Sequence, residues 1–132
     1  MSVLIVDDEP GLCESLRDFL EDEGYVVSTA SNGAEALNLL EGAELPCLMI
    51  LDLIMPVVTG NEVYETMQKD PRLQKVPIVV STSDPARAPA GALIMKKPIN
   101  LDRLLGAVRY HCKGDLRAGR MPAAPQEEHP GT

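Results

Sequence analysis

Four short apolar runs in this sequence each lead into polar side chains that could bind phosphate or a divalent cation. Carboxylates are hard oxygen ligands of the kind that Mg²⁺ prefers. A hydroxyl and an ammonium group can bind the oxygens of a phosphoryl group, and a carboxylate beside Mg²⁺ can attack such a group as a nucleophile. The candidate side chains for this chemistry are Asp7, Asp8, Asp52, Thr82 and Lys97.

The apolar runs that precede these side chains have the length of buried strands. Continuous apolar runs separated by helical patterns predict a parallel sheet that is covered on both faces. The carboxyl ends of the strands in such a sheet share one edge, and binding sites form there. The five side chains are therefore expected to meet in one pocket. Strands are predicted near residues 3–6, 25–27, 47–51, 78–80 and 93–96.

Helical patterns separate the predicted strands, except in one place. Helices are expected over residues 10–24, 32–40, 61–69 and 100–114. The segment 83–92 should also be helical if strands and helices alternate, but it contains Pro89 and Gly91. A proline inside a helix costs roughly 3 kcal/mol or more. We therefore expect at most one helical turn in this segment.

Length and composition indicate one folded domain with a polar tail. The chain has 132 residues, of which 45% are hydrophobic and 24% charged, and this is typical of a globular domain. Residues 1–113 are expected to fold. Residues 114–132 contain three prolines and few large apolar side chains, so this tail is expected to be disordered.

Charge, apolar content and cysteine spacing limit the partners and the cellular compartment that we expect for this protein. A net charge of −8 argues against a direct nucleic-acid partner, because phosphate backbones are bound by Lys and Arg patches. No apolar stretch approaches the roughly 20 residues that cross a membrane. Cys13, Cys47 and Cys112 lack metal-ligand spacing. We interpret them as reduced cysteines of a cytoplasmic protein, with Cys47 buried in the core.

The predicted pocket is acidic, and this has a physical cost. Two carboxylates about 4 Å apart repel by roughly 4 kcal/mol at an effective dielectric constant of 20, so the cluster requires a cation or a retained proton. Each residue also has a simpler interpretation. Asp7 and Asp8 could serve merely to stabilise the start of a helix. Asp52 could be the first residue of a loop, and Lys97 could be a solvated surface charge. A cis Lys97–Pro98 bond would fix the direction of the lysine.

Taken together, the order and spacing of these residues resemble the receiver domain of bacterial two-component response regulators. The resemblance covers about residues 2–112. It implies a flavodoxin-like α/β fold with a five-stranded parallel sheet in the order 2-1-3-4-5 and helices on both faces, the fourth helix being shortened or replaced by a loop. The residues that carry it are Asp7-Asp8, Asp52-Leu53-Ile54-Met55-Pro56, Gly60, Thr82 and Lys97-Pro98.

This resemblance implies a signalling receiver that is activated by phosphorylation. Asp52 would accept a phosphoryl group from a histidine kinase or a histidine phosphotransfer protein, with Mg²⁺ as cofactor. Thr82 and Lys97 would bind the phosphate. Such a protein catalyses only its own phosphorylation and slow dephosphorylation, and it acts on a downstream protein effector. The implied metal ligands are Asp8, Asp7 through water, Asp52 and the backbone carbonyl of Ile54.

The chain departs from the family pattern in three places. The segment after Thr82 is several residues short, and Ile94 occupies the position of a frequent aromatic switch residue. Both belong to the usual output face, so the chemistry is expected to be intact and its readout altered. Ile54, two residues after Asp52, is apolar where many receivers are polar. Our hypothesis is that Ile54 shields the phosphorylated aspartate from water.

Three other functions fit parts of the pattern. A degenerate receiver would bind partners without phosphorylation, and the short segment after Thr82 favours this alternative. An aspartyl-phosphate hydrolase would use the first Asp of an Asp-x-Asp pair, whereas Asp7 and Asp8 are adjacent. A flavodoxin-like cofactor carrier would need a phosphate-binding loop rich in Ser, Thr and Gly after the first strand, and the sequence has acids there.

Overall fold

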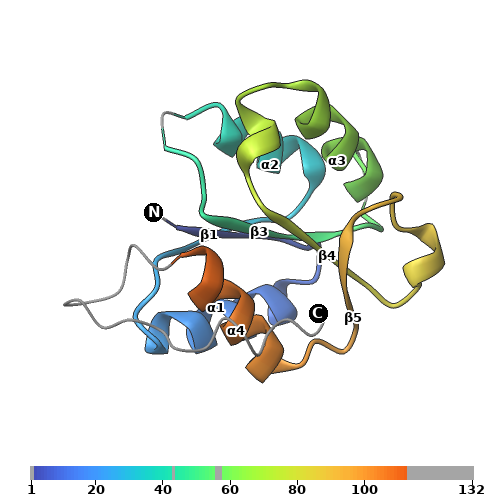
Figure 1. Ribbon diagram of the computed structural model, residues 1–132. Helices are drawn as coiled ribbons and strands as arrows, with labels where there is room; N and C mark the ends of the chain where they lie inside the picture. Colours follow the sequence, from blue (N-terminus) through green and yellow to red (C-terminus); the bar gives the residue numbers. More distant parts are fainter. Residues whose placement is uncertain (1, 43, 56–57, 113–132) are drawn as a thin grey trace.

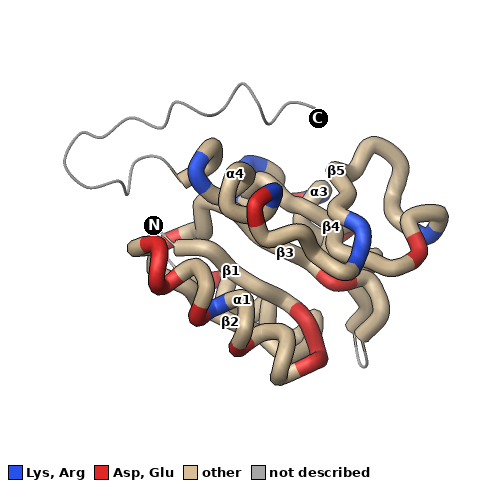
Figure 2. The backbone as a smooth tube through the Cα atoms, turned by 90° about the horizontal axis from the view of Figure 1, so that it is seen from below, with Lys and Arg blue, Asp and Glu red and all other residues tan. Residues whose placement is uncertain are grey.

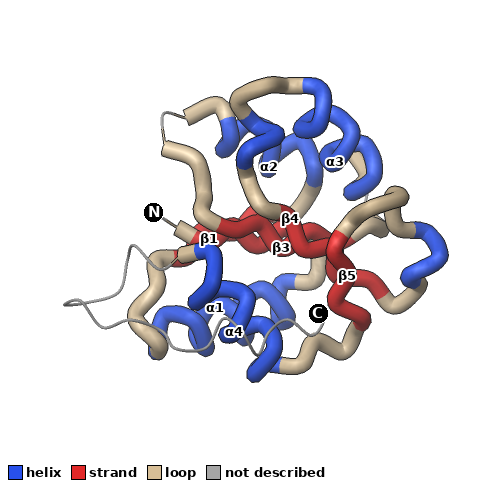
Figure 3. Tube along the Cα trace, viewed as in Figure 1, coloured by secondary structure: helices blue, strands red, loops and turns tan. Residues whose placement is uncertain are grey.

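A five-stranded parallel sheet lies between two layers of helices in the computed structural model, which describes residues 2–42, 44–55 and 58–112. The strand order is β2-β1-β3-β4-β5, so the predicted α/β fold is confirmed. Helices α2 and α3 cover one face, and α1 and α4 cover the other (Figures 1 and 3). The strands are β1 (Val3–Val6), β2 (Val27–Ala30), β3 (Leu48–Asp52), β4 (Ile78–Thr82) and β5 (Leu93–Lys96). The helices are α1 (Pro10–Asp22), α2 (Gly33–Leu40), α3 (Gly60–Lys69) and α4 (Leu101–His111).

The three central strands are apolar along their length because both of their faces are buried. Every residue of β1, β3 and β4 is buried. Successive side chains of a strand point to opposite faces, so these strands supply two cores. The core under α2 and α3 contains Leu4, Val6, Met49, Leu51 and Val80. The core under α1 and α4 contains Val3, Ile5, Leu48, Ile50 and Val79.

Local sequence determines where the helices begin. Pro10 occupies the first turn of α1, where its missing N–H costs nothing. Asn32 caps α2 by accepting a hydrogen bond from the backbone N–H of Glu35 at 2.8 Å. Asn100 caps α4 in the same way. Each cap satisfies an N–H that would otherwise lack a partner.

Both edge strands differ from the sequence prediction. The second strand covers Val27–Ala30 rather than residues 25–27, because polar residues 28 and 29 continue its pairing with β1. β5 is not a buried strand, since Leu93 and Ile94 are 60% and 41% exposed. A single 3-10 turn, Pro85–Arg87, stands between β4 and β5. This confirms the prediction of at most one turn, and it explains the exposure, because so short a segment covers little of an edge strand.

The prediction that all three cysteines are reduced is wrong, because Cys47 and Cys112 form a disulfide. The prediction that Cys47 is buried is confirmed. Cys13 is a free and buried cysteine, and burial together with the negative charge of Asp7 raises the pKa of its thiol to about 11.

The predicted tail, residues 114–132, lies outside the described residues. Within those residues, no helix has the length and apolar character needed to cross a membrane.

Candidate functional site

Three carboxylates meet at the carboxyl edge of the sheet. Asp7 follows β1 and Asp52 ends β3, and these strands are neighbours that pair Val6 with Leu51. Carboxylate oxygens of Asp7, Asp8 and Asp52 lie within 4.8 Å of one another. Asp7 and Asp52 are 4% and 6% exposed, whereas Asp8 is exposed. The sheet therefore holds two buried acids and one exposed acid around a common point.

Lys97 joins this cluster from the end of β5. Its Nζ lies 3.0 Å from Asp7 Oδ2 and 3.3 Å from Asp52 Oδ1. The backbone N–H of Lys97 donates to the carbonyl oxygen of Thr82 at 2.9 Å, which extends the pairing of β5 with β4. The Lys97–Pro98 peptide bond is cis. Figure 2 shows the acidic end of β1 and the basic end of β5 at the same edge of the sheet.

Thr82 does not join the cluster in this structure. It is buried, and its Oγ1 accepts a hydrogen bond from the backbone N–H of Asp84 at 3.1 Å. The strand register pairs Asp52 with Ser81, and Thr82, one residue further, faces the other side of the sheet. Among the described residues, no hydrogen bond links Thr82 to the three acids. Its hydroxyl instead holds the start of the loop that leads to the 3-10 turn.

Gly60 determines how closely α3 approaches the strand that ends in Asp52. The Gly60 N–H donates to the carbonyl oxygen of Leu53 at 2.9 Å. A Cβ at residue 60 would overlap the backbone carbonyl of Asp52 and would lie 2.6 Å from Leu53 Cα. Thr59 caps this helix, and Glu62 completes a capping box. The glycine of the motif is thus required because no side chain fits between α3 and the phosphoacceptor candidate.

The sequence matches a known protein family. A family model described as "Response regulator receiver domain" matches residues 3–109. The chain belongs to this family. It is 38% identical over 120 residues to the response regulator Rre1 of Synechocystis, a match that spans 83% of this chain and 50% of the relative. The chain therefore spans about half the length of that protein.

Other receivers match over nearly their whole length. The polar-differentiation response regulator DivK of Brucella anthropi is 30% identical over 117 residues, which are 83% of this chain and 94% of DivK. The response regulator TrrA of Thermotoga maritima, solved in complex with Mg²⁺–BeF, aligns with a TM-score of 0.71 at 33% identity. That alignment covers 83% of this chain and 98% of TrrA. The fold of this chain is thus the flavodoxin-like fold of receivers in two-component signalling.

The receiver pocket carries an excess of negative charge. Burial and the nearby charge of Asp7 raise the pKa of Asp52, although Lys97 and the backbone N–H of Ile54 act in the opposite direction. Burial by itself lowers the pKa of Lys97, but its hydrogen bonds and ion pairs with Asp7 and Asp52 outweigh this effect and raise that pKa. The lysine is therefore charged at neutral pH, and one ammonium faces three acids.

The donors of this pocket fit Mg²⁺. Three carboxylates within 4.8 Å supply the hard oxygen ligands that Mg²⁺ prefers, and the exposure of Asp8 leaves room for the waters that this ion retains. Asp7 and Asp8 also line a cavity of about 300 Å³ between α1 and the end of β2. Ile54 follows Asp52 by two residues, and its side chain is 55% exposed.

Sequence reasoning missed one buried polar group of the pocket region. Ser81 lies beside Asp52 in the strand register, so both side chains point to the same face of the sheet. The Ser81 hydroxyl is buried and has no hydrogen-bond partner among the described residues. The position of Ser81 one residue before Thr82 could have indicated that its hydroxyl lies near the pocket, but a serine at a strand end is usually only the start of a loop.

Replacing Gly60 with alanine should displace Asp52. The added Cβ meets a backbone carbonyl, which cannot rotate away, so we expect a loss of roughly 1–3 kcal/mol in the free energy of unfolding and weaker Mg²⁺ binding. Gly11→Ala is the matched control: an added Cβ has no atom within 4 Å there, and alanine in a helix gains up to about 1 kcal/mol. Urea unfolding and Mg²⁺ titration measure both effects. Equal behaviour of the two variants would contradict this role of Gly60.

The raised pKa of Asp52 predicts a pH-dependent gain in stability for Asp52→Asn. The folded protein binds the Asp52 proton more tightly than the unfolded chain, whose pKa is near the ordinary 3.8. The stability of the wild type therefore falls relative to that of Asp52→Asn as the pH rises above 3.8. The difference stops growing once the pH exceeds the pKa of Asp52 in the folded protein. Urea unfolding in EDTA between pH 4 and pH 8 measures this difference. A variant that is less stable than wild type at neutral pH would refute the account.

Proposed function

We propose that Asp52 is the phosphoacceptor of this receiver and that the acid cluster binds Mg²⁺. The supporting observation is the convergence of three carboxylates and Lys97 at one edge of the sheet. Asp8 and Asp52 would bind the ion directly, Asp7 through water, and the backbone carbonyl of Ile54 would complete the set. Bound Mg²⁺ would supply positive charge that neutralises the acids and the phosphoryl oxygens.

The chemical step would be a transfer between nucleophiles. A carboxylate oxygen of Asp52 attacks the phosphorus of a phosphohistidine, and a new O–P bond forms as the P–N bond breaks. The electron pair of that bond stays on the imidazole nitrogen. Lys97, which now contacts Asp7 and Asp52, would move its ammonium to an oxygen of the phosphoryl group. Positioning and charge neutralisation, not a further nucleophile, account for the catalysis.

Thr82 would change its hydrogen bond in the phosphorylated state. Its hydroxyl now accepts a bond from the backbone of Asp84, so a turn toward the phosphate would release the start of the short 3-10 segment. A change at Asp52 would thereby reach the surface. Because that segment is one turn long and Ile94 is not aromatic, the output surface would differ from that of a receiver with a full fourth helix.

The proposed partners follow from this chemistry. The donor would be a histidine kinase or a histidine phosphotransfer protein, and the output would be contact with a downstream protein effector in the cytoplasm. Direct contact with nucleic acid is not part of the proposal, given the net charge of −8. Beyond its own phosphorylation and dephosphorylation, we assign the chain no enzymatic activity.

A degenerate receiver is the second candidate function. Two observations favour it: the single turn at Pro85–Arg87, and the placement of the Thr82 hydroxyl outside the acid cluster. Such a module would bind its partner through surfaces that do not depend on phosphate. The retained group of acids with Lys97 argues for the first proposal, because a binding module has no need of three clustered carboxylates.

Modification by acetyl phosphate separates these candidates. With Mg²⁺, the intact mass should rise by one phosphoryl group, and peptide mapping should place the group on Asp52. EDTA or Asp52→Asn should abolish the change, and Asp18→Asn, on the exposed face of α1, should not affect it. The degenerate receiver predicts no adduct. Turnover of phosphomonoesters that is lost in Asp7→Asn would instead indicate a hydrolase.

The lifetime of the phosphorylated form tests the role of Ile54. If its side chain restricts the approach of water to the phosphorylated aspartate, Ile54→Asn should shorten the half-life several-fold, because an amide can hydrogen-bond the attacking water. Val26→Asn is the control, since Val26 is an exposed apolar residue immediately before β2 (64% exposed). The readout is the decay of the phosphorylated mass after the donor is removed. An unchanged half-life in Ile54→Asn would end this hypothesis.

A further inference from the structure

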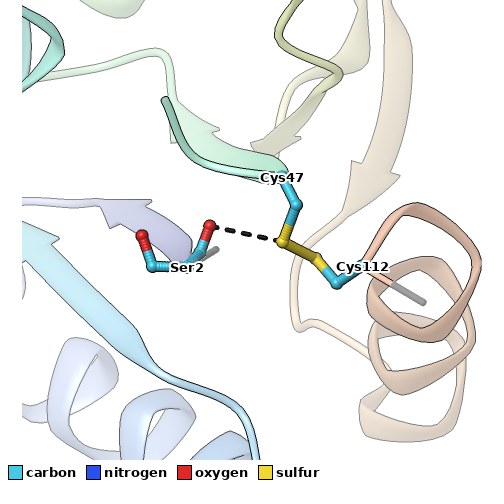
Figure 4. The surroundings of a disulfide bond; sticks show 3 residues. All are labelled: Ser2, Cys47 and Cys112. Atoms are coloured by element: carbon cyan, nitrogen blue, oxygen red, sulfur yellow. Dashed lines mark hydrogen bonds between the residues drawn. A yellow bond between two sulfur atoms is a disulfide. The ribbon is translucent and has the colours of Figure 1, made fainter. Parts of the chain in front are cut away.

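The disulfide between Cys47 and Cys112 has no part in the proposed phosphoryl chemistry (Figure 4). Cys47 immediately precedes β3, and Cys112 is the C-cap of α4. The bond joins residues 65 positions apart whose Cα atoms lie 5.3 Å from each other. Both side chains are buried, at 7% and 0% exposure. The bond therefore fixes the end of the last helix to the sheet.

The disulfide links β3 and α4, and each of these elements also connects to a residue of the pocket at its other end. β3 begins next to Cys47 and ends in Asp52. α4 begins four residues after Lys97 and ends next to Cys112. A covalent bond closes this ring at one end of the sheet, and the ion pair of Lys97 with Asp52 closes it at the other.

α4 is also held by contacts that do not need the disulfide. Leu104 and Val108 are fully buried in the core beneath the helix, and Asn100 caps its first turn. Burial of two large aliphatic side chains contributes several kcal/mol. The reduced chain is therefore expected to keep this fold, with a less constrained last turn, because helix ends open more readily than their centres.

The surroundings of Cys47 suit a thiol as well as a disulfide. Its Sγ lies 3.4 Å from the backbone carbonyl oxygen of Ser2 (Figure 4). A disulfide sulfur has no proton to donate, so this contact becomes a hydrogen bond only when Cys47 is reduced. An acceptor for the reduced state is thus in place, and both redox states of Cys47 are accommodated at the same position.

We propose that Cys47 and Cys112 form a reversible thiol–disulfide pair that sets how firmly the last turn of α4 is fixed to β3. In reduction, a thiolate of an external dithiol attacks one sulfur, and the S–S bond breaks to give a mixed disulfide and a cysteine thiolate. The second thiol of the reductant then displaces the other cysteine. The protein gains two electrons and two protons, and the reductant leaves as a disulfide. A glutathione-type disulfide drives the reverse reaction.

The test uses the full chain without Mg²⁺ or a phosphoryl donor, so its result does not depend on the proposed function. One sample is equilibrated with oxidised glutathione and another with a dithiol reductant. After unfolding, the first should titrate as one thiol, because only Cys13 is free, and the second as all three cysteines. Amides of the last turn of α4 should exchange at least tenfold faster in the reduced sample. Its melting temperature should be lower by roughly 5–15 °C.

Single cysteine variants complete this test. Cys47→Ser and Cys47→Ala should each abolish the response to reductant, and two replacements guard against a side effect of either one. Cys13→Ser is the matched control and should keep the full response. Three titratable thiols in wild type after oxidised glutathione, or equal exchange of α4 in both samples, would overturn the proposal.

Discussion

Repulsion among three carboxylates at one edge of the sheet is the constraint on which the rest of this structure depends. Asp7 and Asp52 are buried, where water screens their charges poorly, and Asp8 stands beside them. At a few ångströms each pair opposes folding by up to a few kcal/mol. The ammonium of Lys97 offsets part of this cost. A further positive charge would stabilise the pocket, and this makes it receptive to a divalent cation.

The fold imposes this arrangement through the geometry of parallel strands. β1, β3 and β5 all end at the same edge, so residues 45 and 90 positions apart along the chain meet there. Packing then fixes the details: Gly60 lets α3 approach the backbone of Asp52, and α4 follows directly from the loop that carries Lys97. The disulfide acts on the same two elements, β3 and α4, at the opposite end of the sheet.

The central strands and the acid cluster were predictable from sequence because the same physical rule determines both. Runs that are buried on both faces must be apolar, and polar residues directly after them must lie at the strand ends. The placement of the Thr82 hydroxyl outside the acid cluster was not predictable in this way, since it depends on the register of β4 with β3 and on a local bond to the backbone of Asp84. The disulfide was missed because Cys47 and Cys112 are distant in sequence, and only the packing of α4 brings them together. The exposure of Ile94 follows from how little the single turn covers, which composition does not reveal.

The claim that carboxylate repulsion governs this pocket is tested most directly by the urea concentration at the midpoint of unfolding, measured as a function of Mg²⁺ concentration. The ionic strength is held constant with NaCl. If repulsion among Asp7, Asp8 and Asp52 is relieved by a bound cation, the midpoint should rise with the logarithm of Mg²⁺ concentration once the site fills, and Asp8→Asn should flatten that rise. A midpoint that responds to Mg²⁺ no more than to NaCl would contradict the account.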